Sequence, residues 1–570
     1  MRTSNGSKIA ALAVALSLFA VACGDDKNST STTAAPETSA AATTAAPETT
    51  GAPETTGAAG AGMRVTYTLS DVAVWNDGSP ITAADFECTR AAVMGTPGSI
   101  STTGYDQITS VKEGSSPKEV VVDYKSIYAP WKLVFGGLLK AAAFKDCNDV
   151  SAGFDGGIPF SGREWKIDSW SAEQLVLVPN EGYKGPRKPG FQKLVFVPAE
   201  DGPTALKAGT VDFIWPQAFT GIDKELADPN VDFTSAGGTS FEGFYFQMKS
   251  GPFADPIYRE AFSKSIDRNA LYQQIYAPFA QGVPLLDCGP IAPGPYCDNA
   301  FKDTYDQAGA DKLMTDNGWT KNADGLWQDK DGKVPEVRWM VNTGNTRRES
   351  TQEYLIPLLK AAGFNVKADN CEAVPCVFQT RLPSLDYDMA MYINTVAPDP
   401  AYLRSWGCDQ IPSDANDNKG QNTQGWCNQD ATDLLIAADK ELDEAKRTDD
   451  VKQVISLMAK DHIMLPLLQF PNVGARRTDR VDNAYAEIAN FDGLNDFYKW
   501  KDVDGDGQII VGAEQYPTND CANPITECAN STWYMTLVAN RVLPGMYITT
   551  ADQTIVPSEF ITGEAKVELL

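Results

Sequence analysis

Two kinds of hydrophobic spacing alternate along the chain from Met63 onward. Short apolar runs, and runs in which apolar and polar residues alternate, are typical of β-strands. They occur in VTYTLSDVAVW, EVVVDY, EQLVLVPN, KLVFVP, VDFIW and FEGFYFQM. Longer runs with helical spacing lie between them: ITAADFECTRAAV, ADPIYREAFSKSIDRNALYQQIY, TQEYLIPLLKAAG and ATDLLIAADKELDEAKRTDDVKQVISLMAKD. The interleaving predicts an α/β fold with helices packed on sheets.

Local signals refine two of these helices. Thr82 is placed to cap the helix that begins in ITAADF, and Asp85 falls in its first turn. The last helical run carries apolar residues at helical spacing, which predicts a stripe that belongs to the core and not to a cofactor site. The stripe consists of Leu434, Leu435, Ala438, Leu442 and Ala445.

The first 62 residues predict export and a tether. A basic start, an apolar stretch from Ile9 to Val21 and small residues before Cys23 are typical of a secretory signal over residues 1–23. The cysteine after small residues resembles the bacterial lipobox and predicts lipidation of Cys23. An ordinary signal peptide with an incidental cysteine is the alternative. Residues 24–62 are near-repeats of Thr, Ala, Pro, Glu and Gly, which cannot bury enough apolar surface to fold. We interpret them as a tether that lifts a domain off a membrane.

The cysteine count agrees with an exported protein. Eleven cysteines less Cys23 leave ten, an even number, and an oxidising compartment permits disulfides. Four pairs are close in sequence, and the two remaining cysteines form a fifth pair. The predicted disulfides are Cys288–Cys297, Cys371–Cys376, Cys408–Cys427, Cys521–Cys528 and Cys88–Cys147. A cysteine-rich metal site is the alternative, but CxxC spacing is absent from the sequence.

Composition narrows the function classes. The 570 residues suffice for two to four domains or lobes, and a formal charge of −27 argues against a nucleic-acid binder. The single histidine, His462, excludes zinc sites built from several histidines, and we interpret it as a helix-end or packing residue. The sequence lacks GxxxxGK[ST], GxSxG and a strand-linked GxGxxG. These observations favour a binding protein without a cofactor over an enzyme.

One acidic segment has the spacing of a calcium loop. DVDGDGQIIVGAE places Asp502, Asp504, Asp506 and Gly507 as an EF-hand does, but the twelfth position is Ala513 and Glu514 comes one residue late. The following IIVGAEQYP is typical of a strand and a turn, where an EF-hand needs a helix. An acidic surface linker is therefore the favoured interpretation, calcium binding is the alternative, and no metal site is predicted.

Several segments, in order, resemble the family 5 extracellular solute-binding proteins of ABC importers, which include oligopeptide-, dipeptide- and nickel-binding proteins. They are WNDGSPITAADFECT, IPFSGREWKIDSWSAEQLVLVPNEGYKG, DGPTALKAGTVDFIW, FEGFYFQMKSGPFADPIYREAFSKSIDRNALYQQIY and LDYDMAMYINTVAPDPAYL. The resemblance covers nearly all of residues 63–500. It implies a bilobed, periplasmic-binding-protein-like α/β fold (type II, three subdomains) that closes a cleft around a small-molecule or peptide ligand.

The resemblance also implies the partners of the protein and its location in the cell. We expect a monomer that is lipid-anchored on the outer face of the cytoplasmic membrane, or periplasmic, and that delivers its ligand to an ABC permease. The implied domains are a small subdomain of the first lobe (63–160 and 545–570), the rest of the first lobe (161–245 and 480–544) and the second lobe (246–479).

The family pattern and residue chemistry suggest which side chains line the cleft. They are Phe244, Tyr245, Gln247, Asn394, Thr395, Val396, Asp399, Trp406, Trp215, Asn523 and Trp533. For Phe244, Trp215 and Trp533 a core position is an equal alternative. Peptide-binding members have an aspartate shortly before their DP motif that pairs with the peptide's α-amino group. Val396 stands at that place here, so we expect weak affinity for peptides with a free N-terminus.

The C-terminal segment resembles the beginning of the family. The family's opening strand, "lnP" element and hairpin are absent before WNDG, and residues 507–570 look like them: IIVGAE, NPIT and VLPGMYITTADQTIVPSEFI. The sequence is therefore interpreted as a circular permutation, with DVDGDG as the join. The final AKVELL alternates as a half-buried strand does, and MRVTYTL at Met63–Leu69 is its predicted partner. An unrelated extension on a truncated lobe is the alternative.

Two rival functions stay open from the sequence. A sensory or signalling lipoprotein could keep this fold without a permease, and gene neighbourhood would separate the two. An exported hydrolase is the other rival, and it requires a nucleophile beside His462.

Overall fold

The computed structural model describes residues 62–570 except 217, 220, 281, 303–304, 417–419 and 486–496. The predicted signal, Cys23 and nearly all of the predicted tether lie outside the described residues. The strands are β1 (Met63–Thr68), β2 (Ile108–Glu113), β3 (Glu119–Tyr124), β4 (Trp165–Trp170), β5 (Leu175–Pro179), β6 (Lys193–Pro198), β7 (Phe213–Ile214), β8 (Val231–Phe246), β9 (Thr320–Lys321), β10 (Trp327–Gln328), β11 (Glu336–Met340), β12 (Asn365–Ala368), β13 (Met389–Thr395), β14 (Met464–Arg477), β15 (Val481–Asp482), β16 (Lys501–Asp502), β17 (Gln508–Ala513), β18 (Tyr547–Thr549), β19 (Ile555–Pro557) and β20 (Lys566–Leu569).

The helices fall mostly between these strands, as the alternating pattern predicts. They are α1 (Ala83–Gly95), α2 (Gly202–Ala208), α3 (Ile222–Glu225), α4 (Pro256–Lys264), α5 (Arg268–Leu271), α6 (Gln307–Asp316), α7 (Thr346–Ala362), α8 (Gln429–Ala438), α9 (Glu444–Lys460), α10 (Thr532–Tyr534) and α11 (Asn540–Val542). In the part of the chain that the structure describes, none of them combines the length and the apolar character that crossing a bilayer requires.

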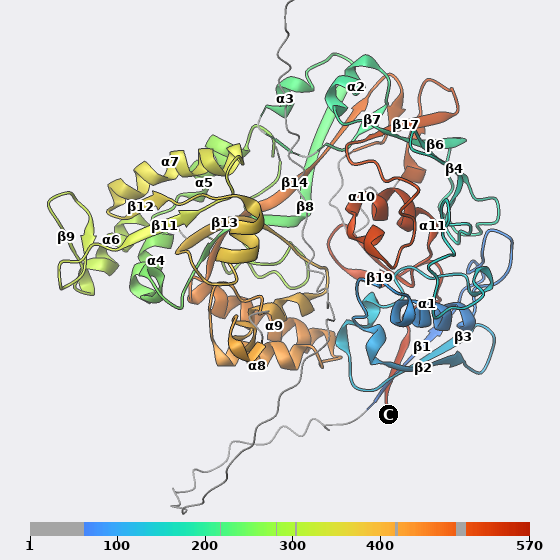
Figure 1. The fold of residues 1–570 in the computed structure, drawn as a ribbon, viewed down its shortest axis with the longest axis horizontal. Coiled ribbons are helices and arrows are strands. Elements are labelled where there is room, and N and C mark those ends of the chain that lie inside the picture. Colours follow the sequence, from blue (N-terminus) through green and yellow to red (C-terminus); the bar gives the residue numbers. More distant parts are fainter. Residues whose placement is uncertain are drawn as a thin grey trace, which may run out of the picture. The chain divides into compact units, whose positions relative to one another are not determined.

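A ten-stranded sheet runs through the folded chain, in the order β12-β11-β13-β8-β14-β7-β17-β6-β5-β4. Its two longest strands, β8 and β14, lie antiparallel at the centre and are visible side by side in Figure 1. On one side of this pair, β17 lies between β6 and β7 and is parallel to both. A strand from the C-terminal segment therefore occupies the middle of a sheet whose other members come from residues 165–477.

A second sheet has four strands in the order β2-β3-β1-β20. β1 pairs antiparallel with β20, with Met63 opposite Leu569 and Val65 opposite Val567, so the predicted partnership of MRVTYTL and AKVELL is confirmed. The C-terminus lies beside β1 in Figure 1. The alternation of AKVELL holds in its first half, where Ala565 and Val567 are half-buried against the first core. At the end of this edge strand it does not hold, because Leu569 is 59% exposed.

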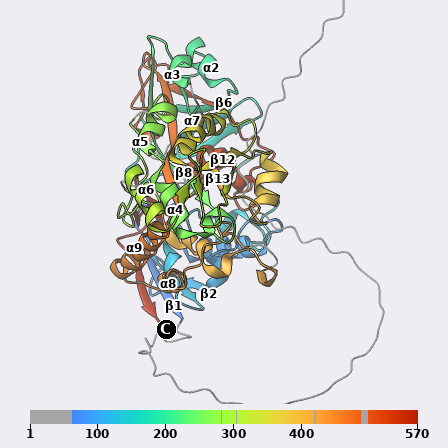
Figure 2. The ribbon, with the colours of Figure 1, turned by 90° about the vertical axis from the view of Figure 1, so that its left-hand side faces the viewer.

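Three hydrophobic cores divide the chain. The first joins residues of β1, β3, β4, β5, β6 and α1 to residues of β17, β18 and the segment 522–543. The second packs α4, α5, α6 and α7 against β8, β11 and β14, and Figure 2 faces these helices. The third packs α8 and α9 against β13 and the segment around Trp406. We call the elements around the first core, together with the adjoining β7, α2 and α3, the first lobe. The other elements around the second and third cores form the second lobe.

The local signals of α1 are confirmed, whereas the last helical run is not continuous. Asp85 Oδ2 accepts from the Thr82 backbone N–H at 2.8 Å at the start of α1. The run that contains Leu434 and Ala445 is split, because α8 ends at Ala438 and Asp443 caps a new helix by accepting from Lys446 N–H at 3.0 Å. Leu442 therefore lies in the connecting loop, where it packs against the first core and not along one helical stripe.

All five predicted disulfides are present. They join Cys88 to Cys147, Cys288 to Cys297, Cys371 to Cys376, Cys408 to Cys427 and Cys521 to Cys528. Four of them close loops of 19 residues or fewer. Such short bridges stiffen connecting segments more than they restrict the whole unfolded chain.

Candidate functional site

A cavity of about 280 Å³ lies in the first lobe, where three parallel strands end. Ala199 and Glu200 follow β6, Glu514 follows β17, and Trp215 follows β7. In open α/β sheets, ligands bind in the crevice outside the carboxyl ends of the parallel strands. The topology of the sheet therefore makes this cavity the candidate ligand site.

The lining of this cavity is acidic and aromatic. Its charged and aromatic residues are Glu200, Asp201, Trp215, Phe219, Glu225 and Glu514. Asp201 begins α2, and its Oδ1 accepts from Thr204 N–H at 3.1 Å. Hydrogen bonds from Thr204 hold the pKa of Asp201 below its ordinary value, so this carboxylate is charged at neutral pH. The site can hold an apolar or aromatic group against the rings and place polar or cationic groups near carboxylates.

One predicted ligand residue, Trp215, lines this cavity and contacts a second one, Trp533. The rings of Trp215 and Trp533 lie 5.2 Å apart at 45°, and Trp215 is half-buried. Trp533 is 8% exposed and belongs to the first core, so it supports Trp215 from behind. Asn523, from the same C-terminal segment, is also buried, and its Oδ1 accepts from Ile525 N–H at 3.0 Å.

The predicted ligand residues of the second lobe are mostly committed to other contacts. Asp399 is 4% exposed and forms a two-pronged ion pair with Arg447, at 2.6 and 2.8 Å. Its Oδ1 also accepts from Ala401 N–H at 2.9 Å. Three contacts on one buried carboxylate are typical of a structural ion pair, because an unpaired buried charge is costly. Asp399 thus fixes the turn after β13.

The other predicted ligand residues of the second lobe divide into core and surface. Phe244 lies in the second core and Val396 in the third. Tyr245 stacks on Tyr392 with 4.0 Å between ring centres, and Asn394 Nδ2 donates to the Tyr245 hydroxyl at 3.3 Å. Gln247 is buried and holds the turn at Lys249 and Ser250. Thr395 is exposed, with its hydroxyl 3.1 Å from that of Ser240.

Trp406 differs from these residues because its indole nitrogen has no hydrogen-bond partner among the described residues. It is 7% exposed, and its indole N–H is buried without an acceptor among the described residues. Its ring centre lies 6.4 Å from that of Tyr402, whose hydroxyl donates to Pro290 O at 2.5 Å. The structure therefore places Trp406 inside the second lobe, away from the Trp215–Trp533 pair.

The loop between α8 and α9 joins the two lobes. Leu442 packs against the first core, and Ala129 N–H donates to Asp439 O at 3.1 Å. Lys132 Nζ lies 2.5 Å from Glu444 Oε1. These three contacts hold the α8–α9 loop of the second lobe against the first lobe.

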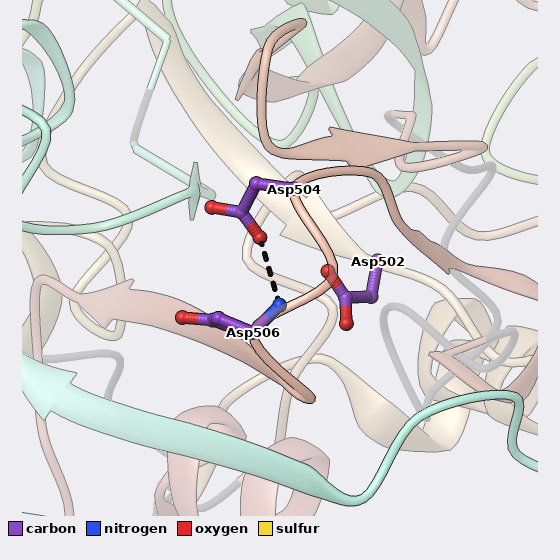
Figure 3. Close-up of side chains that lie close together, drawn as sticks. All are labelled: Asp502, Asp504 and Asp506. Carbon is purple, nitrogen blue, oxygen red and sulfur yellow. Dashed lines mark hydrogen bonds between the residues drawn. The ribbon is translucent and has the colours of Figure 1, made fainter.

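The acidic segment before β17 forms a turn (Figure 3). Asp502 accepts from Gly505 N–H and Gly507 N–H, both at 2.8 Å, and Asp504 accepts from Asp506 N–H at 3.4 Å. One oxygen from each of the three carboxylates lies within 4.8 Å of the others, and Asp504 and Asp506 are exposed. The next residues form strand β17 and not a helix, as the sequence predicts. The carboxylates therefore act as acceptors that shape the link between β16 and β17.

His462 lies beside a different cavity, together with Ser263 and Ser456. The Ser456 hydroxyl donates to Asp298 at 3.2 Å, and the Ser263 hydroxyl has no hydrogen-bond partner among the described residues. A hydrolase needs its nucleophile hydrogen-bonded to its base. Neither serine has that arrangement with His462 in the part of the chain that the structure describes.

Comparison with known proteins identifies the family. The sequence profile of the Bacterial extracellular solute-binding proteins, family 5 Middle, matches residues 59–412. The chain belongs to this family. The oligopeptide-binding protein OppA of Mycobacterium tuberculosis is 25% identical over 449 residues, which are 75% of this chain and 73% of OppA.

Solved structures show that the chain has the family's fold. The ABC transporter substrate-binding protein CtaP of Listeria monocytogenes matches with a TM-score of 0.64 and 17% identity, over 78% of this chain and 88% of CtaP. The periplasmic EDTA-binding protein EppA matches with a TM-score of 0.61 and 19% identity, over 77% of this chain and 85% of EppA. The predicted fold class, a bilobed type II periplasmic-binding-protein-like fold, is therefore confirmed.

The residues that sequence reasoning missed are the carboxylates of the first-lobe cavity. Glu200 follows the predicted strand KLVFVP, and Glu514 ends the run IIVGAE. The sequence predicts both strands but not their parallel pairing, because the partner of IIVGAE lies some 300 residues away in the chain. The rule that ligands bind at the carboxyl ends of parallel strands would have selected both residues once that pairing was known.

Proposed function

We propose that this family 5 solute-binding protein is a lipid-anchored receptor outside the cell. It captures a peptide-like or other small solute by closure of its two lobes and delivers it to an ABC importer. The observation that carries the proposal is the cavity at the carboxyl ends of β6, β17 and β7, with Trp215 on its wall. A carrier needs a preformed concave site and a movable joint, and the contacts at Leu442, Asp439 and Glu444 supply the joint.

The ligand chemistry follows from two features. Val396 is 2% exposed and packs in the third core, so it offers no charge to an α-amino group. The carboxylates Glu200, Glu225 and Glu514 surround the first-lobe cavity and favour positively charged or hydrogen-bond-donating groups. We infer a ligand with an apolar or aromatic part and internal or modified amines. Family relatives include an oligopeptide-binding protein, and a fold neighbour is an EDTA-binding protein.

A thermal-shift screen tests the function directly. A ligand at 100 times its Kd adds about 2.7 kcal/mol to the free energy of unfolding, so true ligands should raise Tm by several degrees. The screen should contain free and N-acetylated peptides of three to five residues, polyamines, opines, sugars and metal chelates. We expect at least one compound that raises Tm and is not chemically changed by the protein. Absence of any stabilising compound, together with turnover of one of them, would contradict the receptor proposal.

Membrane attachment is tested separately. If Cys23 is lipidated after export, mass spectrometry of the N-terminal peptide from the membrane fraction should show a diacylglycerol-modified cysteine. Cys23→Ser should release the protein into the medium. A soluble wild-type protein with an unmodified N-terminus would contradict the anchor and leave the ligand proposal untouched.

We also propose that the chain order is a circular permutation of the family's order. It is supported by β17, which lies between β6 and β7, and by β20, which lies beside β1. A relinked variant with residues 507–570 placed before Met63 restores the family's order. It should fold with a Tm within about 4 °C of the wild type, because the same contacts form. A relinked chain that does not fold would count against this proposal.

A further inference from the structure

A second cavity lies in the second lobe, apart from the strand-end site. Its volume is about 400 Å³, and the chain's only histidine, His462, lies on its wall. The polar residues on its wall come from the ends of α4 and α9 and from the segment before α6. They are Ser263, Lys264, Lys302, Ser456, Lys460 and His462.

Two buried arginines hold the walls of this cavity in place. Arg259 of α4 is 6% exposed, and its Nε donates to Asp461 O at 2.8 Å, directly before His462. Arg268 is 5% exposed and donates to Phe301 O at 2.7 Å and to Pro466 O at 2.9 Å. The three wall segments are thus fixed to one another by charge-assisted hydrogen bonds, which are stronger than neutral ones.

The cavity is basic in a strongly acidic protein. Lys264 has one acidic neighbour, Glu260, at 3.6 Å. Lys302 and Lys460 form no ion pair with any residue that the structure describes. A lysine in the last turn of a helix is common because it offsets the helix dipole, and this accounts for Lys264 and Lys460. It does not account for Lys302, nor for an open cavity between the three lysines.

An unused hydrogen-bond donor lies in the wall of the same cavity. Ser263 is 1% exposed and lines the cavity, and its hydroxyl has no partner within the described ranges. Buried hydroxyls are almost always hydrogen-bonded, so such a group indicates a missing ligand or water. His462 has a φ of 47°, and burial lowers its pKa from the ordinary value. At neutral pH it is an uncharged ring that can donate one N–H to a ligand.

We propose that this pocket binds a small anion that carries phosphate or carboxylate groups. Lys302, Lys460 and Lys264 provide the charge, and Ser263 and His462 provide the oriented donors. Asp298 accepts from Ser456 on the rim, so a bulky polyanion is disfavoured there and a small one is preferred. This site is separate from the solute cavity at the strand ends. A test of it therefore does not depend on the proposed function.

The single histidine gives the binding test one unambiguous signal. In the full chain without a histidine tag, the ring of His462 gives the only histidine ¹H–¹³C cross-peak. Inorganic phosphate and citrate are titrated separately at fixed pH, with sodium chloride at matched ionic strength as the reference. A saturable shift of this cross-peak is expected with one or both anions. The two arms distinguish a phosphate site from a carboxylate site.

Variants assign the shift to the pocket. Lys302→Gln with Lys460→Gln should weaken binding about tenfold or more, because two charge-assisted contacts are lost. Lys330→Gln with Lys333→Gln removes the same charge from exposed positions outside the pocket and should change binding less than about twofold. Ser263→Ala should weaken binding about threefold. A cross-peak that follows ionic strength alone, or equal effects of the two double variants, would overturn the proposal.

Discussion

The Trp215–Trp533 pair and the Asp399–Arg447 pair offer opposite lessons about the same fold. Both contain residues that resemble ligand contacts of the family. Trp215 stands half-buried at the rim of a cavity, supported from behind by a buried ring. Asp399 is sealed under a two-pronged ion pair. The first arrangement leaves surface for a ligand, whereas the second uses its carboxylate for three hydrogen bonds inside the protein.

The difference teaches that a motif position does not tell whether a side chain faces ligand or core. Trp215 follows a strand of a parallel set, where the sheet edge opens. Asp399 begins a turn that must be anchored on α9 through Arg447. Stability should therefore depend on Asp399, and ligand affinity on Trp215.

The largest effect is expected for Asp399→Ala. It leaves the Arg447 guanidinium buried without its partner, which costs about 3–5 kcal/mol of the free energy of unfolding. Urea unfolding followed by circular dichroism measures the loss. The matched control is Asp409→Ala, because Asp409 is 51% exposed in its pair with Arg404 and should cost less than about 1 kcal/mol. Similar losses of unfolding free energy in the two variants would show that the buried Asp399–Arg447 pair matters no more than an exposed one.

Next comes Trp215→Ala, which should act on binding and hardly on stability. Loss of the ring removes apolar contact with the ligand worth about 1.4–3 kcal/mol, so Kd should rise about ten- to hundredfold in calorimetry. Trp319→Ala is the control, since Trp319 is also half-buried but packs on Tyr258 at 5.3 Å in the second lobe. If Trp319→Ala weakened binding as much, the comparison between the two regions would fail.

A smaller and opposite effect on stability is expected for Asp439→Asn. Burial raises the pKa of Asp439 to about 6, so the folded protein binds a proton more readily than the unfolded chain. Stability from this group is present below its ordinary pKa and is lost as pH rises through about 6. The variant should gain about 1 kcal/mol at pH 7.5 and flatten the pH dependence of Tm between about 4 and 6. Asp433→Asn, at an exposed position of α8, should change neither.

The smallest effect is expected at the joint between the lobes. Lys132→Gln removes the ion pair with Glu444 and should weaken ligand binding about two- to fivefold, mainly through faster dissociation. Lys125→Gln, in a looser pair with Asp106 at 3.8 Å, should leave dissociation unchanged. Stopped-flow measurements of ligand release compare the two. Unchanged release from Lys132→Gln would mean that this contact does not hold the closed form.

Much of the fold could be predicted from the sequence because its signals are local. The strands KLVFVP and IIVGAE, the cap at Thr82 and the five disulfides needed only spacing and residue type. The pairing of β1 with β20 was predicted from the family's order, although the two strands are separated by nearly the whole folded chain.

The break between α8 and α9 and the acidic cavity could not be predicted in the same way. Leu442 fits a helical stripe, but α8 ends at Ala438, α9 begins at Glu444, and Leu442 packs on the first core from the loop between them. Glu200 and Glu514 become neighbours through the parallel pairing of β6 and β17, which residue patterns do not reveal. Both features depend on contacts between residues that are far apart in the sequence.

Hydrogen exchange with and without the ligand found by the screen tests the central claim most directly. The account predicts slower amide exchange in residues 199–203, 214–216 and 512–515, at the ends of β6, β7 and β17, and in the 439–444 loop that fastens the lobes. It predicts little change in the turn at Asp399, which is already fixed. Protection confined to residues 396–406 or to the pocket around His462, with none at the strand ends, would contradict it.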